Sequence, residues 1–240
     1  MGTFMTRQTF DRLAEIRRLL IAQLPVTETR SGHPSDIFAP WAGSLLARNR
    51  GIYYVGIALA AECIRGSEQD FEKCVASTLK FISDWQHEKV NTPFWRFFDR
   101  LTLQFLGQHF EAVSDRWGWS NLLKIQWSKG SPGTWPPELI ELQRDICREA
   151  LREEFAQLHE SLVFIGSAKE FAILWSIVGE QHVWNKEHEE KAGIWWLQEN
   201  RTGNLFIKAY HPNYAQQQNF AGAVLDVTSE LARTHLAAFG

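Results

Sequence analysis

The segment from Asn204 to Tyr214 constrains the fold more than any other part of the sequence. Leu205 to Ala209 is a short apolar run preceded by Gly203, which is the pattern of a buried strand. Because proline cannot donate a hydrogen bond to a ladder, the strand must stop at His211-Pro212, and the chain must turn there. The pattern therefore places a histidine at the carboxyl end of a core strand, where open α/β sheets bind their ligands. The alternative is a histidine that only caps the strand end.

Apolar runs that suit strands alternate along the chain with amphipathic stretches that suit helices. Strands are expected over 51–57, 119–125, 162–166, 194–197 and 205–209, and a short turn joins the last two. Helices are expected over 10–20, 68–85, 139–158 and 168–177, with two more beginning at 93 and near 219. The alternation predicts one α/β domain spanning residues 1–240, with the helix and loop of residues 1–50 as an appendage.

Polar residues interrupt these patterns at a few positions. Ser120-Asn121 lies near the start of the strand expected over 119–125. The amide of Asn121 has a donor and an acceptor that suit the edge of an amide-like ring, although an asparagine there can also tie down a neighbouring loop. Gly166-Ser167 joins a strand to a helix whose N-terminus suits an anion. A second pair, His33-Pro34, has no strand before it and is interpreted as turn chemistry, and the polar segment 179–193 as solvated.

A strong helix start lies at Thr92, which suits the N-cap and is followed by Pro93 at the first helical position. Aromatic residues follow, from Phe94 to Phe98. This cluster fits a hydrophobic core better than a binding site.

A net charge of −3 and a pI near 6.3 give the whole chain no electrostatic attraction to nucleic acid. This balance argues against a processive DNA-binding protein, but it leaves room for a local basic rim around one pocket. The eleven tryptophans suit either a core or stacking surfaces for bases, and composition does not separate these uses.

Cysteine spacing and hydropathy bear on the compartment. Cys63, Cys74 and Cys147 lie far apart and form no Cys-x-x-Cys pair, so neither a disulfide framework nor a zinc or iron–sulfur site is indicated. No apolar run approaches the roughly 18 residues needed to span a bilayer. Charged residues also interrupt the N-terminal stretch that a signal peptide would keep apolar. The sequence predicts a cytoplasmic protein with reduced thiols, without a metal and away from membranes.

Five short motifs occur in a fixed order between about residues 51 and 215. They are Val55-Gly56-Ile57-Ala58-Leu59-Ala60, Thr92-Pro93-Phe94-Trp95, Trp119-Ser120-Asn121-Leu122-Leu123-Lys124, Phe164-Ile165-Gly166-Ser167-Ala168 and Tyr210-His211-Pro212-Asn213. Taken together, these motifs resemble those of the uracil-DNA glycosylase superfamily in a divergent form. In that family a first strand ends in glycine before a water-activating residue, a later strand carries a base-reading asparagine, and a His-Pro-Ser loop comes after both.

The resemblance implies a three-layer α/β/α fold with a central, mostly parallel sheet, and a role in DNA base excision. Proteins of this family flip a base out of DNA into a pocket at the carboxyl edge of the sheet. Carried over, Asn121 would pair with the edge of a uracil-type base, and His211 would bond the carbonyl oxygen on which charge develops as the glycosidic bond breaks. The implied partner is single- or double-stranded DNA or a nucleobase, and no cofactor is implied. The other residues implied to contact the ligand are Gly56, Ile57, Ala58, Phe94, Gly166, Ser167, Pro212 and Asn213.

The sequence departs from the family pattern at three positions. Ala58 cannot position or activate a water, and Ala60 replaces the glycine of the turn. Asn213 replaces the serine of the His-Pro loop, although asparagine can still donate to a phosphate. Glu62 is the nearest carboxylate downstream of the first motif and is the candidate catalytic group that would position the water. A glutamate there also suits a solvated helix start.

These observations lead to three hypotheses. The first is an active DNA glycosylase, which hydrolyses the N-glycosidic bond of a uracil-type or other damaged base. The second is a catalytically inactive nucleobase- or nucleic-acid-binding protein on the same fold, which Ala58 favours. The third is an unrelated doubly wound domain whose His-Pro pair is only structural, and in that case Asn121 and His211 would not converge.

Overall fold

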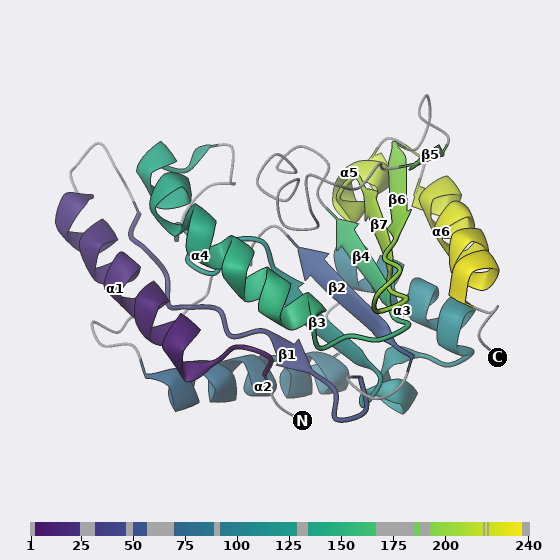
Figure 1. Ribbon diagram of the computed structural model, residues 1–240, viewed down its shortest axis with the longest axis horizontal. Helices are drawn as coiled ribbons and strands as arrows, with labels where there is room; N and C mark the ends of the chain where they lie inside the picture. Colours follow the sequence, from purple (N-terminus) through teal and green to yellow (C-terminus); the bar gives the residue numbers. More distant parts are fainter. Residues whose placement is uncertain are drawn as a thin grey trace.

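The computed structural model describes residues 3–24, 32–46, 50–56, 70–88, 92–128, 134–166, 185–187, 193–217, 219 and 221–236 (Figure 1). The strands are β1 (Trp41–Ala42), β2 (Ile52–Gly56), β3 (Trp117–Asn121), β4 (Leu162–Gly166), β5 (Asn185–Glu187), β6 (Ile194–Gln198) and β7 (Leu205–Ala209). The helices are α1 (Arg7–Gln23), α2 (Phe71–Glu88), α3 (Pro93–Leu106), α4 (Pro137–Phe155), α5 (Pro212–Gln217) and α6 (Ala221–Leu236), with a 3₁₀ turn, η1 (Phe110–Val113).

These strands form one sheet in the order β1-β3-β2-β4-β7-β6-β5. Its centre, from β3 through β2 and β4 to β7, is parallel, whereas β1, β6 and β5 are added antiparallel. Parallel neighbours need crossover connections, and the chain between β2 and β3 includes α2 and α3, while α4 lies between β3 and β4. The expected α/β class with a parallel centre is confirmed. The expected pair of strands joined by a short turn is also confirmed, as the antiparallel neighbours β6 and β7.

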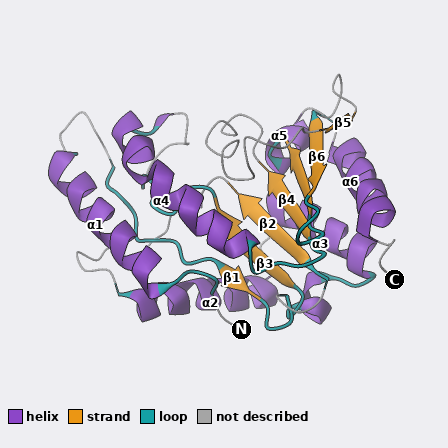
Figure 2. Cartoon of the chain, viewed as in Figure 1, coloured by secondary structure: helices purple, strands orange, loops and turns teal. Residues whose placement is uncertain are grey.

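Helices cover both faces of the sheet (Figure 2). Along β2, alternate side chains point to opposite faces. Tyr54 packs in one core with residues of α2, α3 and α6, whereas Tyr53 and Val55 pack in a second core with residues of α4. A third cluster joins α1 to α4 and to the residues immediately after β3. The central strands β2, β4 and β7 are therefore buried on both sides, which explains why they are nearly continuous apolar runs.

The start of α3 agrees with the sequence pattern. Thr92 is the N-cap, and its hydroxyl oxygen accepts a hydrogen bond of 3.4 Å from the Trp95 backbone N–H. The helix ends at Gly107, whose φ of 72° is a left-handed conformation that glycine adopts without strain. Trp95, Phe97 and Phe98 are buried in the core, as expected, and Phe94 is only partly buried.

The strand expected over 119–125 lies two residues earlier and is shorter. It ends at Asn121, so the prediction that Ser120-Asn121 lies near the strand's start was wrong. Past Asn121 the backbone finds other partners: the Gln143 side chain accepts from the Ile125 N–H at 2.8 Å and donates to the Ile125 carbonyl at 2.6 Å. The apolar residues after β3 are therefore buried beneath α4 and α1, and not in the sheet.

Two further short elements differ from the sequence expectations. The segment 179–193 was interpreted as solvated, but its residues 185–187 form β5, because their backbone pairs with β6. Pro212 turns the chain, as expected, and also begins the short helix α5. Proline suits a first helical position, where its missing N–H costs no hydrogen bond.

The N-terminal region contributes both a helix and a strand to the packing of the domain. Helix α1 packs against α4, and β1 pairs with β3 in the sheet. Arg17 of α1 is buried, donates to the Ser35 carbonyl at 2.6 Å and lies 3.6 Å from an Asp36 carboxylate oxygen. Over the described residues, no helix is both long enough and apolar enough to cross a membrane.

Burial of the Cys147 thiol should make the stability of the folded protein depend on pH in the alkaline range. Burial raises the pKa of this thiol from 9.0 to about 12. Between these values the unfolded chain releases the proton and the folded chain keeps it, so the free energy of unfolding falls by about 1.4 kcal/mol per pH unit for this group. We expect urea unfolding between pH 9 and 10.5 to show a shallower decline for Cys147→Ala than for the wild type, by about that amount. Equal slopes would contradict the buried, protonated thiol.

Candidate functional site

The four parallel strands end at one edge of the sheet, which we call the carboxyl edge. The register pairs Gly56, the last residue of β2, with Asn121, the last residue of β3. On the other side of β2, β4 ends at Gly166, which pairs with Ala209 at the end of β7. His211 comes two residues later. Residues from four separate segments of the chain are therefore brought to neighbouring positions.

Gly56 lies beneath two side chains that approach its backbone closely. A Cβ at this position would lie 2.9 Å from Asn121 Oδ1 and 3.5 Å from Cζ of Phe94. The first distance is too short for a carbon–oxygen contact, so only glycine leaves room for the Asn121 amide here. Gly56, Asn121 and Phe94 thus form a single contact group on the face of the sheet that α3 covers.

Phe94 connects this group to His211. The two rings are stacked, with centroids 5.4 Å apart and planes inclined by 19°. The Phe94 ring also meets Phe98 edge-to-face at 4.2 Å, which anchors it to the core. One aromatic ring in the first turn of α3 therefore contacts His211 and also covers the end of β2.

The His-Pro pair is held by local structure. Pro212 Cδ would lie 3.2 Å from a Cβ on Gly166, so a side chain there would crowd the turn. The His211 carbonyl accepts a hydrogen bond of 3.0 Å from the Ala215 N–H within the first turn of α5. Asn213 is the second residue of α5. The turn after β7 is consequently fixed against the end of β4.

Asn121 is the most unusual polar residue of this region. It is 1% exposed, and its Nδ2 has no hydrogen-bond partner among the residues that the structure describes. A buried donor without a partner costs about 1–3 kcal/mol. Within the described part of the chain, the amide therefore has an unused donor at the carboxyl edge.

The structure brings together six of the residues proposed from the sequence, namely Gly56, Phe94, Asn121, Gly166, His211 and Pro212. Asn213 directly follows Pro212 in the chain, as the second residue of α5. Ile57, Ala58, Glu62 and Ser167 lie outside the described residues. Phe94 connects the two polar residues, because its ring contacts His211 and lies with Asn121 Oδ1 over Gly56.

Sequence reasoning assigned no role to three buried residues next to Asn121. They are Lys124, Glu154 and Tyr53, all fully buried. The signal available in the sequence was a lysine within the otherwise apolar run Leu122-Leu123-Lys124-Ile125. A charge inside such a run needs a partner in the fold, because an unpaired buried charge is very costly.

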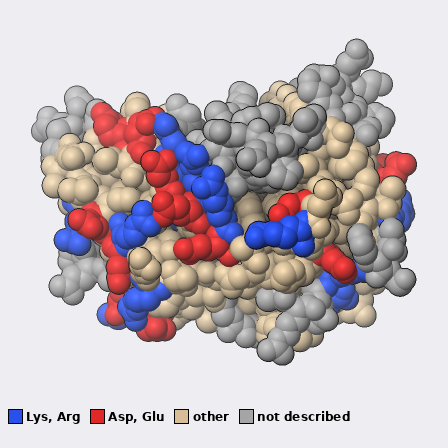
Figure 3. All heavy atoms as spheres, viewed as in Figure 1, with Lys and Arg blue, Asp and Glu red and all other residues tan. Residues whose placement is uncertain are grey.

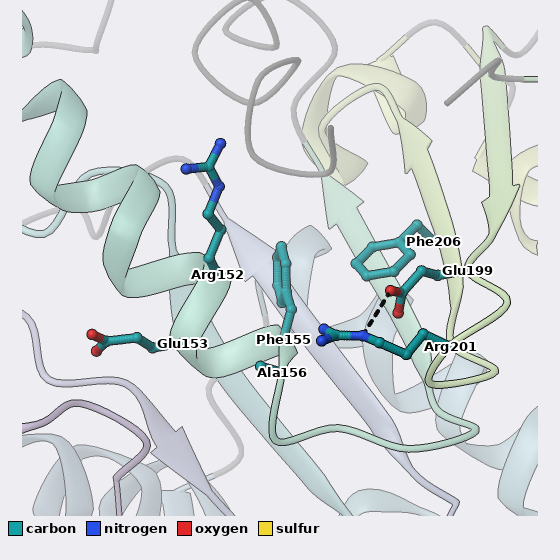
Figure 4. Close-up of a pocket in the computed structure, with 7 residues that line it drawn as sticks. All are labelled: Arg152, Glu153, Phe155, Ala156, Glu199, Arg201 and Phe206. Carbon is teal, nitrogen blue, oxygen red and sulfur yellow. Dashed lines mark ion pairs between the residues drawn. The ribbon is translucent and has the colours of Figure 1, made fainter. Parts of the chain in front are cut away.

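A separate hollow of about 410 Å³ lies at the opposite edge of the sheet (Figure 4). It is formed by the end of α4 and the turn between β6 and β7, and its floor includes Phe155 and Phe206. Arg201 at its rim is paired with Glu199 at 3.5 Å, and the Glu153 side chain points away from the hollow. Its arginines and glutamates largely offset each other in charge, so we do not place the function there.

Charges of both signs lie side by side on the face that α4 covers (Figure 3). Along α4, Arg144 pairs with Glu141, Arg148 with Asp145 at 3.2 Å, and Glu149 with Arg12 of α1. Exposed pairs of this kind add little stability. Among the described residues, this face therefore shows no single-sign basic surface of the kind that typifies proteins binding long stretches of nucleic acid.

Comparison with known proteins leaves the family open. No established protein family matches the sequence, and no curated protein matches it. Within the described ranges, no group of three or more His, Cys, Asp or Glu side chains is arranged to hold a metal ion.

Replacing Gly56 with alanine tests the close packing at the carboxyl edge. The new methyl group would displace the Asn121 amide or the Phe94 ring, so we expect Gly56→Ala to lower the free energy of unfolding by about 1–3 kcal/mol. Urea denaturation measures this change. Gly222→Ala is the matched control, because a Cβ on Gly222 in helix α6 meets nothing within 4 Å. The control should raise stability by about 0.5–1 kcal/mol. If both variants are equally stable, Gly56 is not closely packed.

Proposed function

We propose that the protein binds a single nucleobase, a uracil-type or other damaged base flipped out of DNA, and hydrolyses its N-glycosidic bond. The base would bind at the carboxyl edge of the sheet. The observation that carries this proposal is that Phe94, which lies with Asn121 Oδ1 over Gly56 at the end of β2, also stacks on the His211 ring. These are the amide, the ring and the imidazole that recognition of one flipped heterocycle needs.

Each of the three side chains has a chemical role in this proposal. The Asn121 amide would pair with the edge of the base, since Nδ2 still has a donor to give to a carbonyl oxygen. The Phe94 ring would stack on the base. His211 would donate a hydrogen bond to the base oxygen that gains negative charge as the glycosidic bond breaks.

Access to Asn121 requires a local movement. The amide is 1% exposed, and the Phe94 ring lies over the same glycine that the amide contacts. Phe94 is partly exposed, and changes of side-chain rotamer on binding are common even where the backbone moves little. Rotation of this ring would open the space in which the base stacks.

A second candidate function is binding without turnover. Ala58 stands where the resembling proteins carry a water-activating group, and alanine cannot position a water. An inactive protein would retain affinity for uracil, would lose it on Asn121→Ala, and would release no base. Glu62 is the carboxylate that hydrolysis would require.

The decisive experiment uses oligonucleotides that carry uracil, hypoxanthine or an oxidised base, followed by alkaline cleavage. We expect strand breaks at uracil with the wild-type protein. His211→Ala should slow base release by about a hundred- to a thousandfold, the usual effect of losing one donor to a developing oxyanion.

The matched control is His33→Ala, which removes the other His-Pro histidine, one that hydrogen-bonds Ser128. This control should cleave at the wild-type rate. Uracil binding without strand breaks would show that the protein binds the base without hydrolysing it, which is the second candidate function. Neither binding nor breaks, or equal rates for His211→Ala and wild type, would refute the proposal.

A further inference from the structure

We infer that Lys124 is a positioning residue for Asn121, and that the buried pair it forms with Glu154 keeps it in place. The functional consequence rests on the proposed base binding, whereas the geometric one can be measured without it. Lys124 does not face the base in this scheme. It would act by holding the backbone of the residue that does.

Lys124 Nζ is completely buried and meets one oxygen for each of its three donors. It donates to the Asn121 carbonyl at 2.9 Å and to the Ser120 hydroxyl, and it lies 2.7 Å from Glu154 Oε1. The contact with Glu154 is an ion pair without good hydrogen-bond geometry at Oε1. Two of the three contacts are therefore made to the last two residues of β3.

Glu154 is fixed in turn from another strand. It projects from α4, is completely buried, and its Oε2 accepts a hydrogen bond of 2.9 Å from the Tyr53 hydroxyl of β2. The ammonium group thereby contacts β3 and α4 directly, and Glu154 links it to β2. Such a network resists movement of any single member.

The effect on Asn121 arises from the peptide unit that leads out of β3. At one end of this unit, the Asn121 carbonyl accepts from Lys124; at the other, the Leu122 N–H donates to the Gly56 carbonyl at 2.8 Å. With both polar groups bonded, the peptide plane cannot rotate, and this fixes ψ of Asn121. The direction of its side chain toward Gly56 and Phe94 is then set from the opposite face of the sheet.

Stability alone does not account for this pair. A buried lysine and glutamate lose their hydration, and replacing such a pair with apolar residues of similar size is often neutral or stabilising. The Asn121 carbonyl nevertheless needs a donor. It points away from β2, because the Leu122 N–H of the same peptide unit bonds Gly56, and the pairing with β1 on that side of β3 reaches only Trp119. Lys124 supplies that donor, at the one residue whose amide the proposed function uses.

The test compares Lys124→Met with the double variant Lys124→Met/Glu154→Met. The single change leaves the buried Glu154 carboxylate without its cation and should destabilise the protein. The double change removes both charges and should recover most of that stability in urea denaturation. The Asn121 carbonyl lacks its lysine donor in both, so recovery of stability separates the folding role from the positioning role.

The first readout is the side-chain amide resonance of Asn121 in a ¹⁵N–¹H spectrum, identified by its absence in Asn121→Ala. We expect it to shift or broaden in both Lys124 variants. The second readout is the dissociation constant for uracil, which should rise about tenfold in both, as expected for the loss of one oriented hydrogen bond of about 1.4 kcal/mol.

The control is Asn204→Ala at the opposite edge of the sheet, where the buried Asn204 amide bonds Ser161 and Leu158. It should lose stability and leave both readouts unchanged. The inference would be overturned if the Asn121 side-chain resonance of the stable double variant kept its wild-type position. It would also be overturned if the double variant bound uracil with wild-type affinity. If the wild type binds no uracil, the proposed function fails, and the resonance alone still decides whether Lys124 positions Asn121.

Discussion

The parallel pairing of β2 with β3 on one side and β4 on the other is the constraint on which the rest of the molecule depends. Every residue of β2 is buried, and its register aligns the ends of all three strands. Because the neighbours are parallel, the chain must return across a face of the sheet each time, and helices come to cover both faces. The same alignment leaves the ends of the strands, together with the first residues of the turns beyond them, at one edge.

Much of this arrangement could be predicted, because the central strands are bounded apolar runs. Strands β2, β4 and β7 are each five buried residues that a glycine or the His-Pro pair delimits. The end of β3 could not be predicted in the same way. The apolar residues after Asn121 continue the pattern of a strand, but they are buried by α1 and α4. Strand β5 was missed because its three residues are polar, and its place in the sheet depends on backbone pairing with β6.

The candidate site was predictable to the level of strand ends and no further. The placement of Asn121 and His211 comes from the rule that parallel strands expose their carboxyl ends together. The position of Phe94 over Gly56 depends on the direction of α3, which no local pattern gives. The contacts of Glu154 with Lys124 and Tyr53 join residues 30 and 101 positions apart in the chain, so they depend on the assembled fold.

Two buried asparagines within the same domain allow the roles of Asn121 to be compared. Asn204, at the opposite edge, uses both ends of its amide: Oδ1 accepts from the Ser161 N–H and Nδ2 donates to the Leu158 carbonyl, each at 3.0 Å. That is how an asparagine ties down a loop. Asn121 is equally buried, yet its Nδ2 has no such acceptor within the described part of the chain.

A purely structural asparagine at the end of β3 would therefore be a poor choice, since its unpaired donor costs about 1–3 kcal/mol. Gly56 and Lys124 nevertheless hold this amide in one orientation, one by leaving space and the other by fixing the backbone. A ligand that brings a carbonyl oxygen to Nδ2 would remove that cost on binding. The affinity for such a ligand would then come partly from energy stored in the unliganded fold, which is the reason to look for a carbonyl-bearing heterocycle at this edge.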